Sequence, residues 1–139
     1  MSNVLQLYKQ ARDGTLPPDF DQWSLSAPGW EGMTVAHVAA RWGHLPPDFD
    51  QWELANDRGY TVAHRAAQFG TLPPDFDQWS LSAPGWDGWT VAHIAAVRGY
   101  LPPDFDQWGL QDSDGVTVAK IAALYNNLPT DFHQVDLLD

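Results

Sequence analysis

Two short patterns of apolar residues alternate along the chain. The first is a run such as TVAHVAARWG at 34–43, in which small apolar side chains follow a threonine and a glycine closes the run. Thr34 is a typical N-cap residue, the alanines allow close packing, and Gly43 is typical of the position after a helix. The pattern therefore predicts a short helix that begins after Thr34 and ends before Gly43.

The second pattern is the octapeptide LPPDFDQW. Its two prolines suit a first helical turn, and Leu16, Phe20 and Trp23 follow one another at i, i+4 and i+7, which predicts a second short helix with an inward apolar stripe. Helices of two turns are unstable alone, so neighbouring units must stack to bury these stripes. The octapeptide occupies 16–23, 45–52, 72–79 and 101–108, and an altered copy, LPTDFHQV, occupies 128–135.

The units alternate in length. The leucine that opens each octapeptide recurs after 29, 27, 29 and 27 residues. The two extra residues lie in the links at 23–34 and 79–90, which contain SAPGW, whereas the links at 52–61 and 108–117 are shorter. This is how loop insertions behave, so we expect the loops at 26–30 and 82–86 to project from the same edge of the stack.

The segment DRGYTVAHRAAQFG at 57–70, and the corresponding segment from residue 114 onward, resemble the ankyrin repeat. That family's turn and first helix usually read D-x-x-G-x-T-P-L-H-x-A-A-x-x-G. Here Val and Ala replace Pro and Leu, and the units have 27 or 29 residues, whereas ankyrin repeats usually have 33. The resemblance covers nearly the whole chain.

The resemblance implies an all-α, helical-repeat solenoid of about five stacked short helix pairs joined by tight turns. We expect one domain over 1–139, with an N-terminal cap at 1–23, repeats at 24–116 and a C-terminal cap at 117–139. The N-terminal cap would use NVLQLYKQARDG as its first helix, capped by Ser2 or Asn3. In the C-terminal cap, Lys120 replaces the repeated histidine.

Sequence variation is concentrated at a few positions of each unit. Residues 15–43 and 71–99 differ at only five of 29 positions. Three of these positions, at 38, 41 and 42, fall on one helical face. By resemblance, this face and the preceding turn are where ankyrin proteins contact their partners. The predicted partner-binding set is Trp30, Met33, Val38, Arg41, Trp42, His44, Tyr60, Arg65, Gln68, Phe69, Trp86, Trp89, Ile94, Val97, Arg98 and Tyr100.

The alternative interpretation of this stripe is a buried core. Arg65, Gln68 and Arg98 at equivalent positions favour exposure, because charged side chains are rarely buried without partners. Trp30 and Trp86 have two interpretations as well, since each could bind a partner or fold over its own loop. The tryptophans of the octapeptides are instead expected in the core: Trp23, Trp52, Trp79 and Trp108.

Histidines 37, 64 and 93 do not predict a metal site. Successive units of a helical stack lie about 10 Å apart, whereas zinc needs ligand atoms about 2 Å from one centre. The ankyrin resemblance instead implies that this histidine makes a structural hydrogen bond to the turn. His44 and His133 are isolated in the sequence.

Composition narrows the classes of partner. There are 18 Asp and Glu against 7 Lys and Arg, giving a net charge of −11, which disfavours nucleic acid. No apolar stretch is long enough to span a membrane, and no secretory signal is recognisable. The chain has no cysteine, no phosphate-binding glycine loop and no HExxH motif. We therefore expect a monomeric, cytoplasmic or recombinant protein without catalytic activity, cofactor or metal.

A fixed framework with variation on one face indicates a protein-binding module. The hypothesis is an engineered, consensus-like ankyrin scaffold that presents its variable face to a protein or peptide partner. One alternative is a natural bacterial short-ankyrin interaction protein that arose by recent tandem duplication. Another is a designed repeat protein without a partner, made to study stability, although exposed aromatic residues such as Trp42 and Phe69 would have no purpose there.

Overall fold

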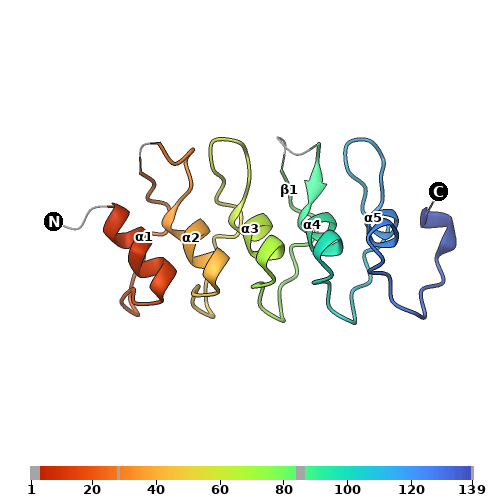
Figure 1. Ribbon diagram of the computed structural model, residues 1–139, viewed down its shortest axis with the longest axis horizontal. Coiled ribbons are helices and arrows are strands. Elements are labelled where there is room, and N and C mark those ends of the chain that lie inside the picture. Colours follow the sequence, from red (N-terminus) through yellow and green to blue (C-terminus); the bar gives the residue numbers. More distant parts are fainter. Residues whose placement is uncertain (1–3, 28, 84–86, 139) are drawn as a thin grey trace.

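The chain forms a row of short helices that stand side by side in sequence order (Figure 1). The computed structural model describes residues 4–27, 29–83 and 87–138. Each α-helix packs against the next one along the chain. The structure is therefore helical and repeat-like. The helices are α1 (Val4–Asp13), α2 (Val35–Trp42), α3 (Val62–Phe69), α4 (Val91–Arg98) and α5 (Val118–Leu124), followed by the 3-10 helix η2 (Val135–Leu138).

The predicted helix limits are confirmed. A threonine side chain accepts a hydrogen bond from the backbone three residues later at the start of α2, α3, α4 and α5. Gly43, Gly70 and Gly99 end the first three of these helices in the left-handed conformation, with φ of 75°, 71° and 76°. Glycine adopts this conformation without steric cost, so the helices end at defined residues. The expected caps of α1, Ser2 and Asn3, lie outside the described residues.

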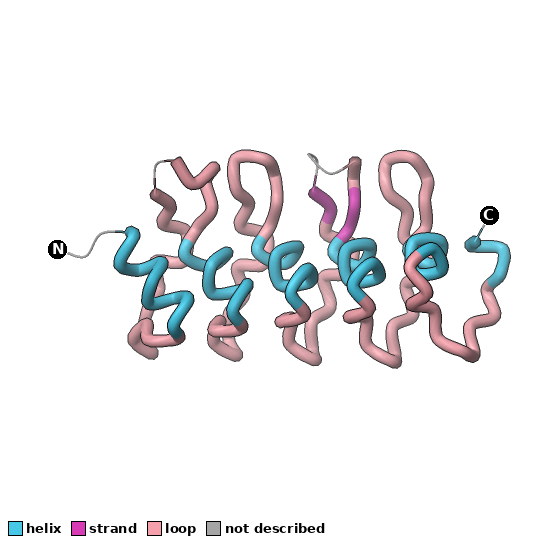
Figure 2. The backbone as a smooth tube through the Cα atoms, viewed as in Figure 1, coloured by secondary structure: helices cyan, strands magenta, loops and turns pink. Residues whose placement is uncertain are grey.

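The octapeptides are not helices, which corrects the prediction of helix pairs. In each copy the backbone N–H of the phenylalanine donates to the carbonyl of the first proline, as from Phe49 to Pro46 at 3.1 Å, and a second turn follows from Leu54 to Gln51 at 3.2 Å. A residue before proline is disfavoured in the α conformation, so consecutive prolines leave too few residues for a helix. Each unit thus has one helix, and the octapeptide returns as an irregular segment (Figure 2).

The aromatic residues of the octapeptides form a continuous edge-to-face ladder. Within a unit the rings of Phe49 and Trp52 are 5.0 Å apart, and between units Trp52 reaches Phe76 at 5.3 Å. The same contacts continue from Phe20 to Phe132. The four octapeptide tryptophans are buried, as predicted, and Phe20 at the first position is half-buried. This packing accounts for the repeated Phe and Trp, since each ring between the two ends of the ladder contacts two others.

The loops that link each octapeptide to the next helix project from one edge of the row (Figure 1). One loop carries the antiparallel pair β1 (Ser82–Ala83) and β2 (Trp89–Thr90). The backbone N–H of Asp57 donates to the carbonyl of Glu31 at 2.8 Å, and that of Ser113 to Asp87 at 2.8 Å. The described parts of both longer loops therefore lie at the same edge, as expected, and each contacts the shorter loop that follows. Residues 28 and 84–86 are outside the described part of the chain.

A buried side chain connects each unit to the next. The Nε2 of His37 lies 2.9 Å from the carbonyl oxygen of Tyr60 in the following unit, while its Nδ1 accepts from the backbone N–H of Thr34 at 3.1 Å. This pattern fixes the tautomer with the proton on Nε2. His64 and His93 make the equivalent contacts with the carbonyls of Trp89 and Val116. The hydrogen bond expected of these histidines is confirmed, and it joins neighbouring units.

Tyr8 takes this role in α1. Its hydroxyl donates to the carbonyl of Met33, which is the residue equivalent to Tyr60, and accepts from the N–H of Ala27 at 2.9 Å. At the other end, Lys120 occupies the histidine position of α5, and the hydroxyl of Thr117 donates to the carbonyl of Leu137 in η2 at 2.5 Å. A tyrosine at the first helix and a threonine at the last thus make the contact between neighbouring segments that a histidine makes elsewhere.

Candidate functional site

The predicted binding residues fall into three groups by exposure. Trp86 lies outside the described residues. Trp30, Arg41, Trp42, His44, Phe69, Arg98 and Tyr100 are exposed; Met33, Val38, Arg65, Gln68, Trp89 and Val97 are half-buried; Tyr60 and Ile94 are buried.

Tyr60 and Ile94 correct the expectation that the whole varied set is exposed. Each is only 5% exposed. The Tyr60 ring stacks on His37, with centroids 6.5 Å apart, and its hydroxyl donates to Gln68 at 2.5 Å. Ile94 packs into the core, whereas Arg65 at the equivalent position is half-buried and can extend a charged end outward. The sequence differences at these two positions therefore change side chains of the interior as well as of the surface.

Trp89 is also not an exposed side chain. It is half-buried, its ring lies 5.7 Å from that of His93, and its carbonyl is the acceptor for His64. Trp89 thus takes part in the bridge between units, and a contribution to binding would come from its remaining exposed edge.

His44 and Tyr100 lie against the preceding unit. A Cβ placed on Gly14 would come within 2.9 Å of the His44 ring, and one on Gly70 within 3.0 Å of the Tyr100 ring. Thr71 occupies the same position against Gly43. This varied position therefore fills the space that a glycine leaves open, although Tyr100 remains 50% exposed.

The exposed residues of the first units border a groove. It has a volume of about 580 Å³ and lies across the faces of α1, α2 and α3, beside the first long loop. Trp30 forms one side, with its ring 4.8 Å from Tyr8 in an edge-to-face contact. The tryptophan thus packs on α1 and stays 46% exposed. The lining residues are Leu5, Tyr8, Lys9, Arg12, Trp30, Val38, Arg41, Trp42 and Arg65.

Two arginines of the groove lining, Arg41 and Arg65, stack on aromatic rings of α2 and α3. The Arg41 guanidinium lies 4.8 Å from the Trp42 ring and 5.0 Å from the Phe69 ring. Arg65 lies 5.2 Å from the same Phe69 ring. Such stacking restrains the guanidinium planes while their in-plane N–H groups remain able to donate.

Positive charge is concentrated in the groove. Four of the seven Lys and Arg residues of the chain line it: Lys9, Arg12, Arg41 and Arg65. In the described part of the chain, the ion pairs are Arg12–Asp13 and Arg58–Glu31, so the other three groove cations form none.

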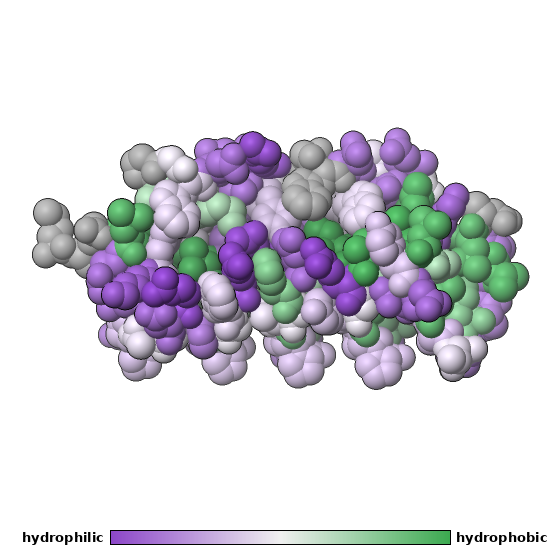
Figure 3. Space-filling model, viewed as in Figure 1, coloured by the Kyte–Doolittle hydropathy of each residue, from purple (hydrophilic) through white to green (hydrophobic). Residues whose placement is uncertain are grey.

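Aspartates gather along the octapeptides instead. A separate hollow of about 360 Å³ is lined by Asp19, Asp21, Asp48 and Asp50. Figure 3 shows strongly hydrophilic side chains over the α-helices and apolar ones towards the C-terminal end of the row. The helix face, which holds the groove and its four cations, therefore differs in charge from the octapeptide edge, which holds the aspartates.

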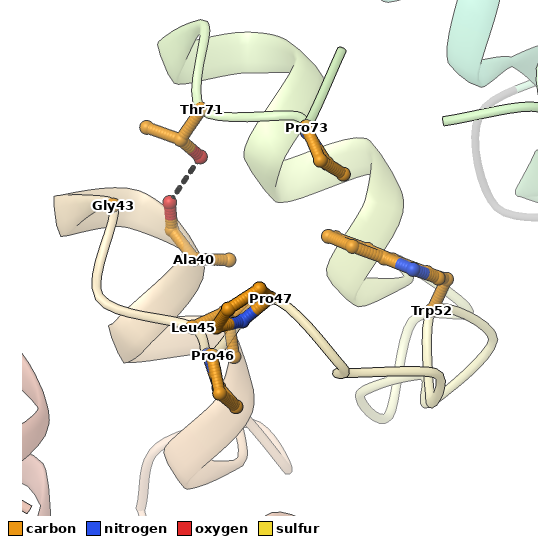
Figure 4. A pocket seen from close by; sticks show the side chains of 8 residues that line it. All are labelled: Ala40, Gly43, Leu45, Pro46, Pro47, Trp52, Thr71 and Pro73. Carbon is orange, nitrogen blue, oxygen red and sulfur yellow. Dashed lines mark hydrogen bonds between the residues drawn. The ribbon is translucent and has the colours of Figure 1, made fainter. Parts of the chain in front are cut away.

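A smaller hollow lies between α2 and the next unit (Figure 4). It has a volume of about 80 Å³, and across it the hydroxyl of Thr71 donates to the carbonyl of Ala40. An equivalent hollow of about 210 Å³ lies further along, beside Asn127. Because it recurs between units, we attribute it to stacking. The residues that line the first hollow are Ala40, Gly43, Leu45, Pro46, Pro47, Trp52, Thr71 and Pro73.

The buried histidines do not form a site for chemistry. Burial lowers the pKa of His37 to about 4, and it lowers the pKa of His64 and His93 as well. These imidazoles are therefore neutral near pH 7, and both ring nitrogens of His37 already have partners. Among the described residues, no three His, Asp or Glu side chains are placed to hold a metal ion.

Comparison with known proteins gives no support to the ankyrin resemblance, which depends on the repeated residues alone. No protein-family model matches the chain, and no curated protein matches it. Within the part of the chain that the structure describes, no helix is both long and apolar enough to cross a bilayer.

The contribution of α1 to the groove was missed from the sequence. Leu5, Tyr8, Lys9 and Arg12 have no copies elsewhere in the chain, so comparing units could not single them out. The available signal was charge, since Lys9 and Arg12 lie one turn apart at the start of a strongly acidic chain.

Proposed function

We propose that the protein is a non-enzymatic binding module that holds a protein or peptide segment in the groove across α1, α2 and α3. The observation that carries the proposal is the group of exposed aromatic side chains in and next to this groove. Trp30, Trp42 and Phe69 are 46%, 47% and 36% exposed. These side chains take part neither in the aromatic ladder nor in the histidine hydrogen bonds between units. Holding the fold together is therefore not their evident role.

Such residues suit binding for a physical reason. Tryptophan and arginine are enriched at the energetic centres of interfaces, because they combine a large apolar area with directional hydrogen bonds. A groove of about 580 Å³ lies in the size range of sites that enclose a few side chains. Partly formed contacts, such as Trp30 on Tyr8, also restrict the rings before a partner arrives.

We propose further that the units are divergent ankyrin repeats stacked as a solenoid, on the strength of the TVAH run at residues 61–64 and its copies. The variable helix face agrees with an engineered, consensus-like scaffold, and a duplicated natural protein remains the alternative origin. A scaffold without a partner is disfavoured by the exposed rings, because apolar surface of this kind promotes aggregation.

Selection from a peptide-display library, followed by affinity measurements on the recovered peptides, tests the binding face. We expect Trp42→Ala to weaken their binding by about tenfold or more, as for a residue at an energetic centre. Tyr125→Ala is the matched control, because Tyr125 is exposed at the other end of the row. The groove is not the binding site if Tyr125→Ala weakens peptide binding as much as Trp42→Ala does. It is also not the binding site if neither variant weakens binding.

A further inference from the structure

Resting on the proposed function, we propose that the occupant of the groove is an acidic peptide segment with one large apolar side chain. Its carboxylates would meet Arg41, Arg65 and Lys9, and its apolar side chain would lie between Trp30 and Trp42. The two requirements come from different residues of the groove, so each can be tested separately.

The carboxylate requirement follows from the charges. The chain has 18 acidic residues, yet Lys9, Arg41 and Arg65 form no ion pair among the described residues. Among the described residues, the Nε–H of Arg65 is buried without a hydrogen-bond partner, although the guanidinium does interact with the Tyr60 hydroxyl. A buried donor without a partner is costly, and a carboxylate can accept from a guanidinium in two parallel bonds. An acidic partner would therefore supply the counter-charge that these three cations lack among the described residues.

The apolar requirement follows from the rings. Leu5 and Val38 line the groove together with Trp30 and Trp42, and Leu5 is 55% exposed. An aromatic or branched aliphatic side chain placed there would cover apolar surface on both sides. A peptide with charge alone would leave these residues in water.

A second copy of the chain fits the groove less well. Its octapeptides offer aspartates, but the intervening phenylalanines, such as Phe49 and Phe76, are buried in the ladder. The octapeptides would thus bring carboxylates without an apolar anchor, whereas the exposed apolar side chains Leu124, Tyr125 and Val135 lie at the C-terminal end of the row. A nucleic acid offers negative charge and bases that stack, but the net charge of −11 repels a long phosphate backbone.

Fluorescence anisotropy with labelled peptides tests the proposal. The probe is a pool of ten-residue peptides that carry four glutamates around a central Leu, Phe or Trp. A matched pool carries glutamine in place of glutamate. We expect the glutamate pool to bind about tenfold more tightly than the glutamine pool and to weaken as salt is added. Arg41→Gln and Arg65→Gln should each remove about fivefold or more of that affinity. Lys120→Gln is the matched control, because Lys120 is a cation in α5, outside both the groove lining and the predicted partner-binding set.

The remaining outcomes separate this inference from the proposed function. If the glutamine pool binds as tightly, and Trp42→Ala still weakens it, the groove binds peptides but its occupant is not acidic. If neither pool binds in a way that Trp42→Ala alters, the groove itself is wrong. Tighter, arginine-dependent binding of a labelled single-stranded oligonucleotide would overturn the peptide in favour of nucleic acid. Sedimentation showing dimers that Arg41→Gln dissociates would overturn it in favour of a second copy.

Discussion

Trp23 and Trp30 lie in the same unit, but their surroundings differ. Trp23 is 7% exposed and contacts Phe20 and Phe49 in the ladder, whereas Trp30 is 46% exposed and contacts one ring, that of Tyr8. The octapeptide edge thus holds its aromatics between units, and the helix face leaves its aromatics beside a groove. The comparison shows that the role of a tryptophan here depends on how many neighbours enclose it.

The largest effect is expected at the octapeptide edge. Trp79→Ala removes a buried ring that lies 5.0 Å from Phe76 and 5.5 Å from Phe105. Truncation of a core aromatic costs about 3–5 kcal/mol, so the free energy of unfolding measured with denaturant should fall by that amount. A loss below about 1 kcal/mol would show that the ladder is not part of the core.

Acid should weaken the histidine bridges next. Because burial depresses the pKa of His37 from 6.5 to about 4, the unfolded chain binds a proton in this pH window and the folded chain does not. Stability is therefore lost as pH falls from about 6.5 to 4, and His37 alone should account for about 2 kcal/mol between pH 7 and pH 5. Denaturant unfolding at both pH values measures this.

His37→Gln provides the comparison for the pH experiment. Glutamine at this position can still complete the capping box with Thr34 but does not titrate. The variant should show a smaller stability difference between pH 7 and pH 5 than the original chain. Equal differences would mean that His37 does not hold the pKa that its burial implies.

A loss of similar size is expected at Tyr8, which lines the groove and also bonds to the next unit. Tyr8→Phe keeps the ring beside Trp30 but leaves the N–H of Ala27 and the carbonyl of Met33 without this partner. Such a change costs about 1–3 kcal/mol. Tyr125→Phe, at an exposed tyrosine, is the control and should leave thermal unfolding unchanged. Similar melting of both variants would remove Tyr8 from the series of bridges.

The smallest effect on stability is expected on the helix face. Trp42 is 47% exposed, so Trp42→Ala should change the free energy of unfolding by only about 0.5 kcal/mol. The half-buried Trp89 is unsuitable for this comparison, because it packs on His93. A cost for Trp42→Ala approaching that of Trp79→Ala would abolish the distinction between the two regions.

Local chemistry made the helices predictable. Threonine caps and closing glycines fix their limits, and these signals act within a few residues. The octapeptide misled the prediction because its i, i+4, i+7 spacing matches a helical stripe, although Pro46 and Pro47 at its start favour turns. Its burial was predicted nevertheless, because stacking units must cover large aromatic side chains whatever their backbone conformation.

The candidate site was less predictable because it depends on contacts between units. Comparing copies identified Trp42 and Phe69, but it also selected Tyr60, which is buried against His37 of the preceding unit. Variation marks a position where different side chains are tolerated. Such a position can be packed against a neighbouring unit as well as exposed to solvent. The α1 side of the groove has no repeated counterpart, so only the structure places Leu5 and Lys9 beside Trp42.

The loop contacts have a consequence for how such a chain can grow. The longer loop of one unit bonds to the shorter loop of the next through Glu31 and Asp57, and again through Asp87 and Ser113. Gly32 is needed at this junction, since a Cβ there would come within 2.8 Å of the Asp57 nitrogen. The smallest repeat that keeps these loop contacts is a pair of units, one with a long loop and one with a short loop. Duplication or recombination would therefore preserve the contacts only by copying such a doublet as a whole. Residues 15–43 and 71–99, two units apart, agree at all but five of 29 positions, as the long units of two such doublets would.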